Sequence, residues 1–209
     1  MVQRAPRMGE EWNKVVFSDE SRFGLFHSDG RARVWRRVGE RYHPDCLAPT
    51  VKFGGGSVMV WGCFSWWGVG PLVVVKGTLD QNSYVDMISK HLMPYLRRVE
   101  EQVTGVIFQE DNAPCHTGGY ATWWRQTHSI NCMPWPAQSP DLNPIEHLWD
   151  HLDRQARKRR PLPTSHTELA AALQDEWDRI PLEELRKLIT SMPTRVATVI
   201  QAKGLHTPY

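Results

Sequence analysis

The segment "VVFSDESRFG", residues 15 to 24, decides the fold because its apolar run stops abruptly at a serine and two acids. A brief run rich in Val and Phe is typical of a strand covered on both faces of its sheet. We therefore predict a short buried strand over "NKVVFSD", residues 13 to 19, that ends at Asp19. Such a strand delivers a carboxylate to the edge of the sheet.

The same pattern recurs in "GVIFQED", where an apolar run ends at Glu110 and Asp111. If the two strands are neighbours, Asp19 and Asp111 lie side by side, and like charges at that separation repel unless a cation neutralises them. Mg²⁺ and Mn²⁺ are hard cations that take carboxylate oxygen. The alternative is that each aspartate is an ordinary strand-end residue. Glu20 and Glu110 are rival ligands, but strand alternation points them to the opposite face.

A third acid, Glu146, begins a helix predicted over "PIEHLWDHLDRQARKR", residues 144 to 159. One interpretation is a capping box, with Asn143 as N-cap, Pro144 as the first helical residue and Glu146 as the third. The same geometry keeps Glu146 off the buried stripe of the helix, so it can also face the sheet edge. That stripe is formed by Ile145, Leu148, Trp149 and Leu152. Asp150, one turn later, is the alternative ligand.

The other predicted elements alternate between strands and helices. An Asp-Gly between two alternating runs indicates a hairpin over residues 22–37, followed by a loop to residue 56. Further strands are predicted at 57–64, 70–77 and 130–136, and further helices at 83–102, 117–128, 166–180, 181–190 and 191–203. Pro94 is expected to bend the helix over 83–102 or to start a new turn there. This order indicates an α/β or α+β fold with helices packed on a sheet.

Composition excludes several classes of protein. With 209 residues, 41% hydrophobic and 23% charged, the chain is an ordinary folded protein of one domain. No apolar run approaches the roughly 18 residues of a membrane span, and no signal-peptide core is present. We therefore expect an intracellular protein with no membrane partner. The four cysteines form no CxxC pair, which argues against a disulfide scaffold or a structural zinc site.

Polar and basic side chains near the acids are candidates for a supporting role. Asn112 and His116 follow the second acid in "DNAPCH", where they can orient a phosphate or a bound water, although His116 can equally cap the next helix. A basic run ends the helix that carries Glu146. It is either a solvated end that suits the helix dipole or a set of phosphate contacts formed by Arg154, Arg157, Lys158, Arg159 and Arg160.

Four motifs carry a resemblance to a known family. They are "FSDES" at 17–21, "GGGSVMVWGCF" at 54–64, "FQEDNAPCH" at 108–116 and "WPAQSPDLNPIEHLWDHL" at 135–152. Together they resemble the catalytic domain of mariner-superfamily DDE transposases, particularly the branch that includes Sleeping Beauty. The match covers nearly the whole chain, and the 34 residues between the second and third acids are the spacing typical of that branch.

The resemblance implies an RNase H-like fold, with a mixed five-stranded sheet flanked by helices, a C-terminal helical extension and three acids at one edge. By motif, Asp19 is the first acid, Asp111 the second and Glu146 the third. They would bind Mg²⁺ or Mn²⁺, as two ions, to cleave DNA at transposon ends and join the 3′-hydroxyl ends to target DNA at TA sites. It further implies a homodimer in a paired-end complex and a nuclear location.

The resemblance also predicts the domain organisation. We expect one catalytic domain over residues 1–209, with an insertion at 22–56 and a helical tail at 164–209. Family members carry helix-turn-helix modules that recognise transposon ends, whereas this chain begins 18 residues before the first acid, so we expect that region to be absent. The alternative function is a non-enzymatic DNA-binding or assembly module, and an RNA-cleaving enzyme is a third interpretation. The three intact acids favour an enzyme over the non-enzymatic module, and comparing RNA–DNA hybrids with duplex DNA distinguishes the two enzymes.

Overall fold

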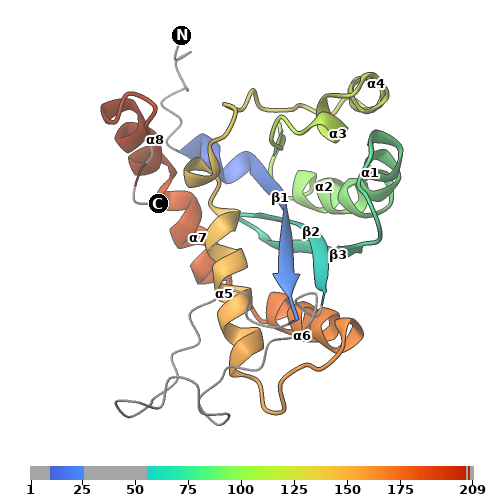
Figure 1. Cartoon of the computed structure of the whole chain (residues 1–209). Helices are drawn as coiled ribbons and strands as arrows, with labels where there is room; N and C mark the ends of the chain where they lie inside the picture. The colour runs from blue at the N-terminus through green and yellow to red at the C-terminus, as the bar shows by residue number, and fades with distance from the viewer. Residues whose placement is uncertain (1–9, 26–55, 206, 208–209) are drawn as a thin grey trace.

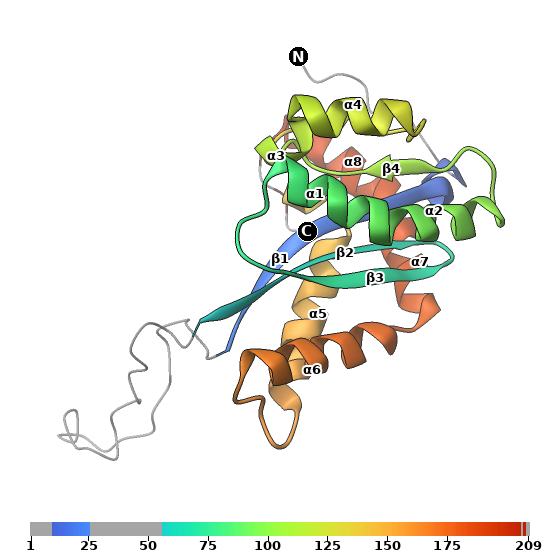
Figure 2. The same ribbon diagram turned by 90° about the vertical axis from the view of Figure 1, so that its right-hand side faces the viewer.

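The fold is built around a mixed sheet. The computed structural model describes residues 10–25, 56–205 and 207, so most of the hairpin and loop predicted over 22–56 lies outside the described residues. The sheet has the order β3-β2-β1-β4, with β1 antiparallel to β2 and parallel to β4. Figure 1 labels β1, β2 and β3, and Figure 2 labels β4 as well. Its strands are β1 (Val15–Gly24), β2 (Ser57–Ser65), β3 (Gly68–Val75) and β4 (Ile107–Gln109).

Strand β1 is longer than the sequence predicted. The prediction that it ends at Asp19 is wrong, because antiparallel pairing with β2 continues as far as Gly24 opposite Ser57. Asp19 instead lies in the middle of the strand, opposite Gly62. The strand therefore continues for five residues beyond Asp19.

The predicted fifth strand is missing from the described sheet, which has four strands. Over residues 130–136 the structure has an isolated parallel bridge between Phe108 and Cys132. Pro134 and Pro136 lack the N–H groups that a longer ladder needs, so the pairing stops after the bridge. The other strand predictions, at 57–64 and 70–77, are confirmed as β2 and β3.

Helices cover both faces of the sheet, as Figure 2 shows. One group comprises α1 (Gln81–Met87), the π-helical segment η4 (Ile88–Leu92), α2 (Met93–Glu100), α3 (Pro114–Thr117) and α4 (Gly119–Thr127). The other comprises α5 (Ile145–Lys158), α6 (His166–Asp178), α7 (Leu182–Thr190) and α8 (Met192–Gln201). Short 3₁₀ turns precede β1 (Glu10–Lys14) and α5 (Pro140–Leu142). No helix of the described residues is long and apolar enough to cross a membrane.

Two hydrophobic cores result, one on each face of the sheet. Alternation along β1 sends Val15 and Phe17 into the core that contains α5 and α6, and Val16 into the core that contains α1 and α2. The same alternation continues through Asp19 and Glu20. It therefore sends these two neighbouring acids to opposite faces of the sheet.

Candidate active site

Asp19 is held by helix α5 through an indole. Trp149 Nε1 donates a hydrogen bond of 2.9 Å to Asp19 Oδ2. The indole reaches the strand because Gly62, opposite Asp19, has no side chain: a Cβ there would lie 2.8 Å from Trp149 Cη2. Packing restricts the Trp149 side chain, since its ring stacks on that of Trp177 with centroids 5.4 Å apart. The glycine and the stacked indoles therefore fix Asp19.

The electrostatics of Asp19 and Glu146 indicate an uncompensated negative site. Burial raises the pKa of Asp19 to about 7; the Trp149 hydrogen bond opposes this rise, and the charges of Glu146 and Glu20 add to it. Burial also raises the pKa of Glu146, with a further contribution from Asp150. Asp19 and Glu146 are thus close enough to repel each other, and both favour a cation nearby.

The start of helix α5 differs from the predicted capping box. The helix begins at Ile145 with Pro144 as its N-cap, and Glu146 makes no capping hydrogen bond. Asn143 Oδ1 accepts from the backbone N–H of Ile145 at 3.3 Å, while its Nδ2 donates to the Ser18 carbonyl at 3.0 Å. The box is absent because Asn143 is turned inward to the sheet. Glu146 stays partly exposed in the first turn, as the alternative interpretation required.

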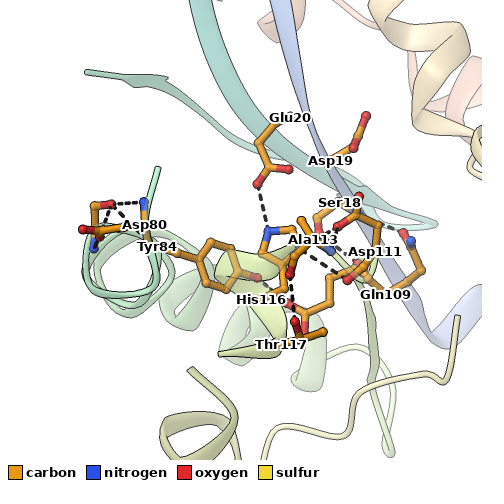
Figure 3. Close-up of polar contacts among 12 residues, drawn as sticks. Ser18, Asp19, Glu20, Asp80, Tyr84, Gln109, Asp111, Ala113, His116 and Thr117 are labelled. Carbon is orange, nitrogen blue, oxygen red and sulfur yellow. Dashed lines mark hydrogen bonds and ion pairs between the residues drawn. The ribbon is translucent and has the colours of Figure 1, made fainter. Parts of the chain in front are cut away.

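Asp111 follows β4 and is held by His116. Its Oδ1 lies 2.7 Å from His116 Nδ1 and accepts from the Ala113 N–H at 2.9 Å. Figure 3 shows the imidazole between Asp111 and Glu20, whose Oε1 is 3.2 Å from Nε2. Burial disfavours the imidazolium, but these two carboxylates outweigh it and raise the His116 pKa to about 11. The bond from His116 lowers the pKa of Asp111. His116 is therefore a fixed cation at neutral pH.

The rival acids lie on the other face of the sheet and are paired. Glu110 accepts a hydrogen bond from the Tyr84 hydroxyl, and its Oε1 lies 3.0 Å from Arg125 Nη1. Burial raises the pKa of Glu110, while Tyr84 and Arg125 oppose that rise. Glu20 pairs with His116 as described above. The prediction that alternation separates Glu20 from Asp19 is confirmed.

The ladder between β1 and β4 ends just before the first two acids. Phe17 and Gln109 form the last pair of the β1–β4 ladder, and Asp19 and Asp111 each lie two residues beyond it. Half of the Asp111 side chain is exposed, so it is accessible from solvent. In the described part of the chain, however, no three His, Cys, Asp or Glu side chains converge closely enough to hold one metal ion.

The basic run after Glu146 divides into paired and exposed side chains. Arg159 Nη2 lies 3.0 Å from Asp175 and 2.8 Å from Glu176, so it joins the end of α5 to α6. Arg157 pairs with Asp153 within α5 at 2.8 Å. The exposed basic residues of the run are Arg154, Lys158 and Arg160.

The structure assigns contacts to several residues of this site that the sequence did not indicate. Asn112 was predicted to support the acids, and the structure adds that its Nδ2 donates to the Trp135 carbonyl at 2.8 Å, tying two loops together. Trp149 was predicted only as a core residue, and no role was predicted for Gly62 or Arg125. Their positions follow from the β1–β2 register and the packing of α4 and α5, which no local pattern encodes.

The fold defined by this sheet and its helices is that of mariner transposase catalytic domains. A crystal structure of the mariner Mos1 paired end complex with Mg matches with a TM-score of 0.75 and 21% identity, covering 94% of this chain and 57% of that chain. The Mos1 transposase catalytic domain with Raltegravir and Mg matches with a TM-score of 0.67 and 19% identity, covering 94% and 86%. The prediction of an RNase H-like fold is thereby confirmed.

The sequence comparisons establish the family. Residues 14–167 match the family described as DDE superfamily endonuclease. The Tcb1 transposase of Caenorhabditis briggsae is 42% identical over 199 residues, which are 95% of this chain and 71% of that protein. The Tc1 transposase of Caenorhabditis elegans is 42% identical over 200 residues, 96% and 72%. The chain therefore belongs to the DDE superfamily and is a transposase-type catalytic domain; the non-enzymatic alternative is not favoured.

Proposed function

We propose that the chain cleaves phosphodiester bonds at transposon ends and joins the 3′-hydroxyl ends to target DNA, with Asp19, Asp111 and Glu146 as its catalytic carboxylates. The observation that carries the proposal is a pair of half-buried acids, Asp19 and Glu146, whose pKa values are both raised, close to the end of β4 that Asp111 follows. Carboxyl groups with raised pKa values are typical of functional sites, because burial and neighbouring like charges destabilise the ionised form.

The donor set fits Mg²⁺ or Mn²⁺, which prefer carboxylate oxygen. Asp19, Asp111 and Glu146 would hold the metal, and we propose two ions. Once bound, such ions supply the charge that polarises an attacking oxygen and stabilises a leaving one in phosphoryl transfer. The Mos1 structures named with Mg and with Mn support a divalent metal for this chain as well.

The protein's own residues orient the acids around that chemistry. His116 stays protonated at neutral pH, so it serves as a fixed cation that holds the Asp111 carboxylate and pairs with Glu20. Asn112 anchors the loop beyond Asp111 through the Trp135 carbonyl. These contacts leave Asp111 oriented before metal or DNA arrives.

The partners follow from the same proposal. Transposon ends and target DNA, at TA sites, are the substrates, and the exposed basic side chains at the end of α5 would contact phosphates. A second copy of the chain would complete a paired-end dimer, as in the Mos1 paired end complex. Acting on chromosomal DNA, the protein would work in the nucleus.

The proposal is tested by Mn²⁺ titration and by cleavage and strand transfer with labelled duplex DNA. We expect Asp19→Asn, Asp111→Asn and Glu146→Gln each to abolish DNA cleavage and to weaken Mn²⁺ binding at least about tenfold. Circular dichroism would verify that each variant is folded. Full Mn²⁺ affinity and full cleavage in any one of them would remove that acid from the site.

Asp150→Asn provides the matched control, since Asp150 is an exposed acid one turn after Glu146 on the same helix. It should retain both Mn²⁺ binding and cleavage. If Asp150→Asn is inactive while Glu146→Gln is active, Asp150 is the third ligand. Replacing duplex DNA by an RNA–DNA hybrid tests the RNA-cleaving alternative, which predicts cleavage of the hybrid alone.

A further inference from the structure

A buried group of three polar side chains lies where strands β1 and β4 separate. The parallel ladder ends with the pair Phe17 and Gln109, after which the chain beyond β4 leaves the sheet. The main-chain N–H and C=O of Ser18 therefore lose their strand partners at this point. A buried main-chain group without a hydrogen bond is costly.

Two side-chain amides replace the missing strand. The Ser18 N–H donates to Gln109 Oε1 at 3.3 Å, and the Ser18 carbonyl accepts from Asn143 Nδ2 at 3.0 Å. The Ser18 hydroxyl closes the group by donating to the Gln109 carbonyl at 2.8 Å. We call Ser18, Gln109 and Asn143 the polar node. Their exposed fractions are 2%, 0% and 5%, so all three are inside the protein.

Each member of the polar node is a near neighbour of one proposed acid. Ser18 directly precedes Asp19, Gln109 lies two residues before Asp111, and Asn143 lies three residues before Glu146. The side-chain oxygen of Asn143 accepts a hydrogen bond from the Ile145 N–H, which fixes the first turn of α5. Three segments far apart in sequence are thus joined by hydrogen bonds immediately beside the residues that carry the carboxylates.

Hydrophobic packing alone would not require these residues. Buried amides and hydroxyls cost free energy unless they are paired, and Gln109 Nε2 makes no hydrogen bond to the described residues. Hydrogen bonds, unlike apolar contacts, fix distance and direction between the groups that they join. A group with this cost and this geometry is better suited to aligning main chains than to filling space.

We infer that Ser18, Gln109 and Asn143 are positioning residues, which hold the main chains at Asp19, Asp111 and Glu146 in the register that metal binding needs. The inference rests on the proposed function, because it concerns the same three acids. Because the polar node is buried, its role is to orient the acids rather than to bind DNA or metal itself.

The test compares two buried serines in the same sheet. Ser18→Ala removes the hydroxyl of the polar node but keeps both main-chain hydrogen bonds, so the variant should fold. Ser65→Ala is the matched control, because Ser65, the last residue of β2, is also fully buried, and its Oγ hydrogen-bonds the Tyr95 hydroxyl at 2.8 Å instead of a main chain beside the acids. Each variant should lower the melting temperature by about 2–4 °C.

The distinguishing measurement is Mn²⁺ affinity by electron paramagnetic resonance, without DNA. We expect Ser18→Ala to weaken binding about tenfold, as loss of supporting hydrogen bonds around metal ligands does, and Ser65→Ala to leave it unchanged. Ser18→Thr keeps the hydroxyl and should restore the affinity. Asn143→Ala, which removes two hydrogen bonds, should weaken binding further; if it fails to fold, Ser18→Ala still decides.

The outcomes separate this inference from the proposed function. Wild-type protein that binds no Mn²⁺ would overturn the proposed function, and the inference with it. Equal Mn²⁺ affinity in the wild type and in Ser18→Ala would overturn the inference alone. A loss in Ser18→Ala that Ser65→Ala reproduces would assign the effect to general loosening of the sheet and would also overturn the inference.

Discussion

Trp149 Nε1 lies 2.9 Å from Asp19 Oδ2, so helix α5 holds this acid, in the middle of β1, through a hydrogen bond from its indole. Trp149 is three residues after Glu146 on the same helix. One turn of α5 therefore supplies both the acid Glu146 and the indole that donates to Asp19. A shift of α5 along the sheet would therefore displace both Glu146 and the indole that holds Asp19. The relationship makes the indole a sensitive point for substitution.

Trp149→Phe should weaken metal binding at neutral pH. The indole hydrogen bond opposes the effect of burial on Asp19, so its removal should raise the pKa of that acid further above about 7. Since a metal must then displace a proton, Mn²⁺ affinity should reach its plateau at a higher pH than in the wild type. Titrations from roughly pH 6 to roughly pH 8.5 would measure the displacement.

Trp177→Phe is the control for the loss of an indole. Trp177 is buried, stacks on Trp149 and donates its own Nε1 to the Gly70 carbonyl at 2.8 Å. Both variants should lose about 2–4 kcal/mol of unfolding free energy, through weaker packing and the removal of one hydrogen bond. An identical pH profile in the two variants would show that the Trp149 hydrogen bond does not tune Asp19.

Asp19→Asn should stabilise the metal-free protein at alkaline pH. The folded-state pKa of Asp19 is raised from 3.8 to about 7, so the wild type loses stability as pH rises between these values, where the unfolded chain has already ionised. The asparagine variant has no such loss. Its melting temperature should exceed that of the wild type by about 2 °C or more at pH 8, with no difference at pH 4.

Added Mn²⁺ should reverse this order. A bound cation offsets the free-energy cost of burying the ionised Asp19 carboxylate. The wild type should therefore gain stability from Mn²⁺ at pH 8, while Asp19→Asn gains little. Thermal melts at the two pH values, with and without Mn²⁺, make the measurement. A metal-free variant that is less stable than the wild type at pH 8 contradicts the assigned pKa.

Much of this fold could be predicted because its signals are local. The stripe of Ile145, Leu148, Trp149 and Leu152 is buried as its helical spacing predicted. Pro94 was expected to bend or restart the helix over 83–102, and the structure has a π-helical segment ending just before α2, where Pro94 is the second residue. A proline without an N–H fits at such a start.

The predictions that were wrong concern features set by contacts between segments far apart in the sequence. Nothing local to "FSDES" indicates that β1 continues past Asp19, because the continuation depends on β2, which lies more than thirty residues further along the chain. The capping box at Glu146 was a valid local interpretation, but Asn143 instead satisfies a carbonyl of β1. Strand alternation did separate Asp19 from Glu20, since that rule needs only the strand itself.

Arg125→Met should destabilise the protein strongly. Arg125 neutralises Glu110, which is 7% exposed, and its Nη2 also donates to the His116 carbonyl at 2.8 Å. Removing one partner of a buried pair leaves an uncompensated charge, at a cost of about 3–5 kcal/mol in unfolding free energy. Urea denaturation at neutral pH would measure the loss.

The double variant Arg125→Met with Glu110→Gln separates the charge from the packing. The glutamine can still accept from the Tyr84 hydroxyl, so the double variant should recover at least about 1–2 kcal/mol relative to Arg125→Met. If the double variant is as unstable as the single one, the instability comes from removing the shape and hydrogen bonds of Arg125. The ion pair would then contribute little.

The exposed and paired basic residues of α5 should differ in DNA binding. Arg154 and Lys158 are exposed, whereas Arg159 is engaged by Asp175 and Glu176. Replacing Arg154 and Lys158 together by Ala should reduce the slope of log affinity against log salt by about 0.9 for each phosphate that the variant no longer neutralises. Arg159→Ala should leave that slope unchanged and lower stability by about 0.5–1 kcal/mol. Fluorescence anisotropy with duplex DNA over a salt series would distinguish the two groups, and an unchanged slope in the double variant would remove this end of α5 from the DNA interface.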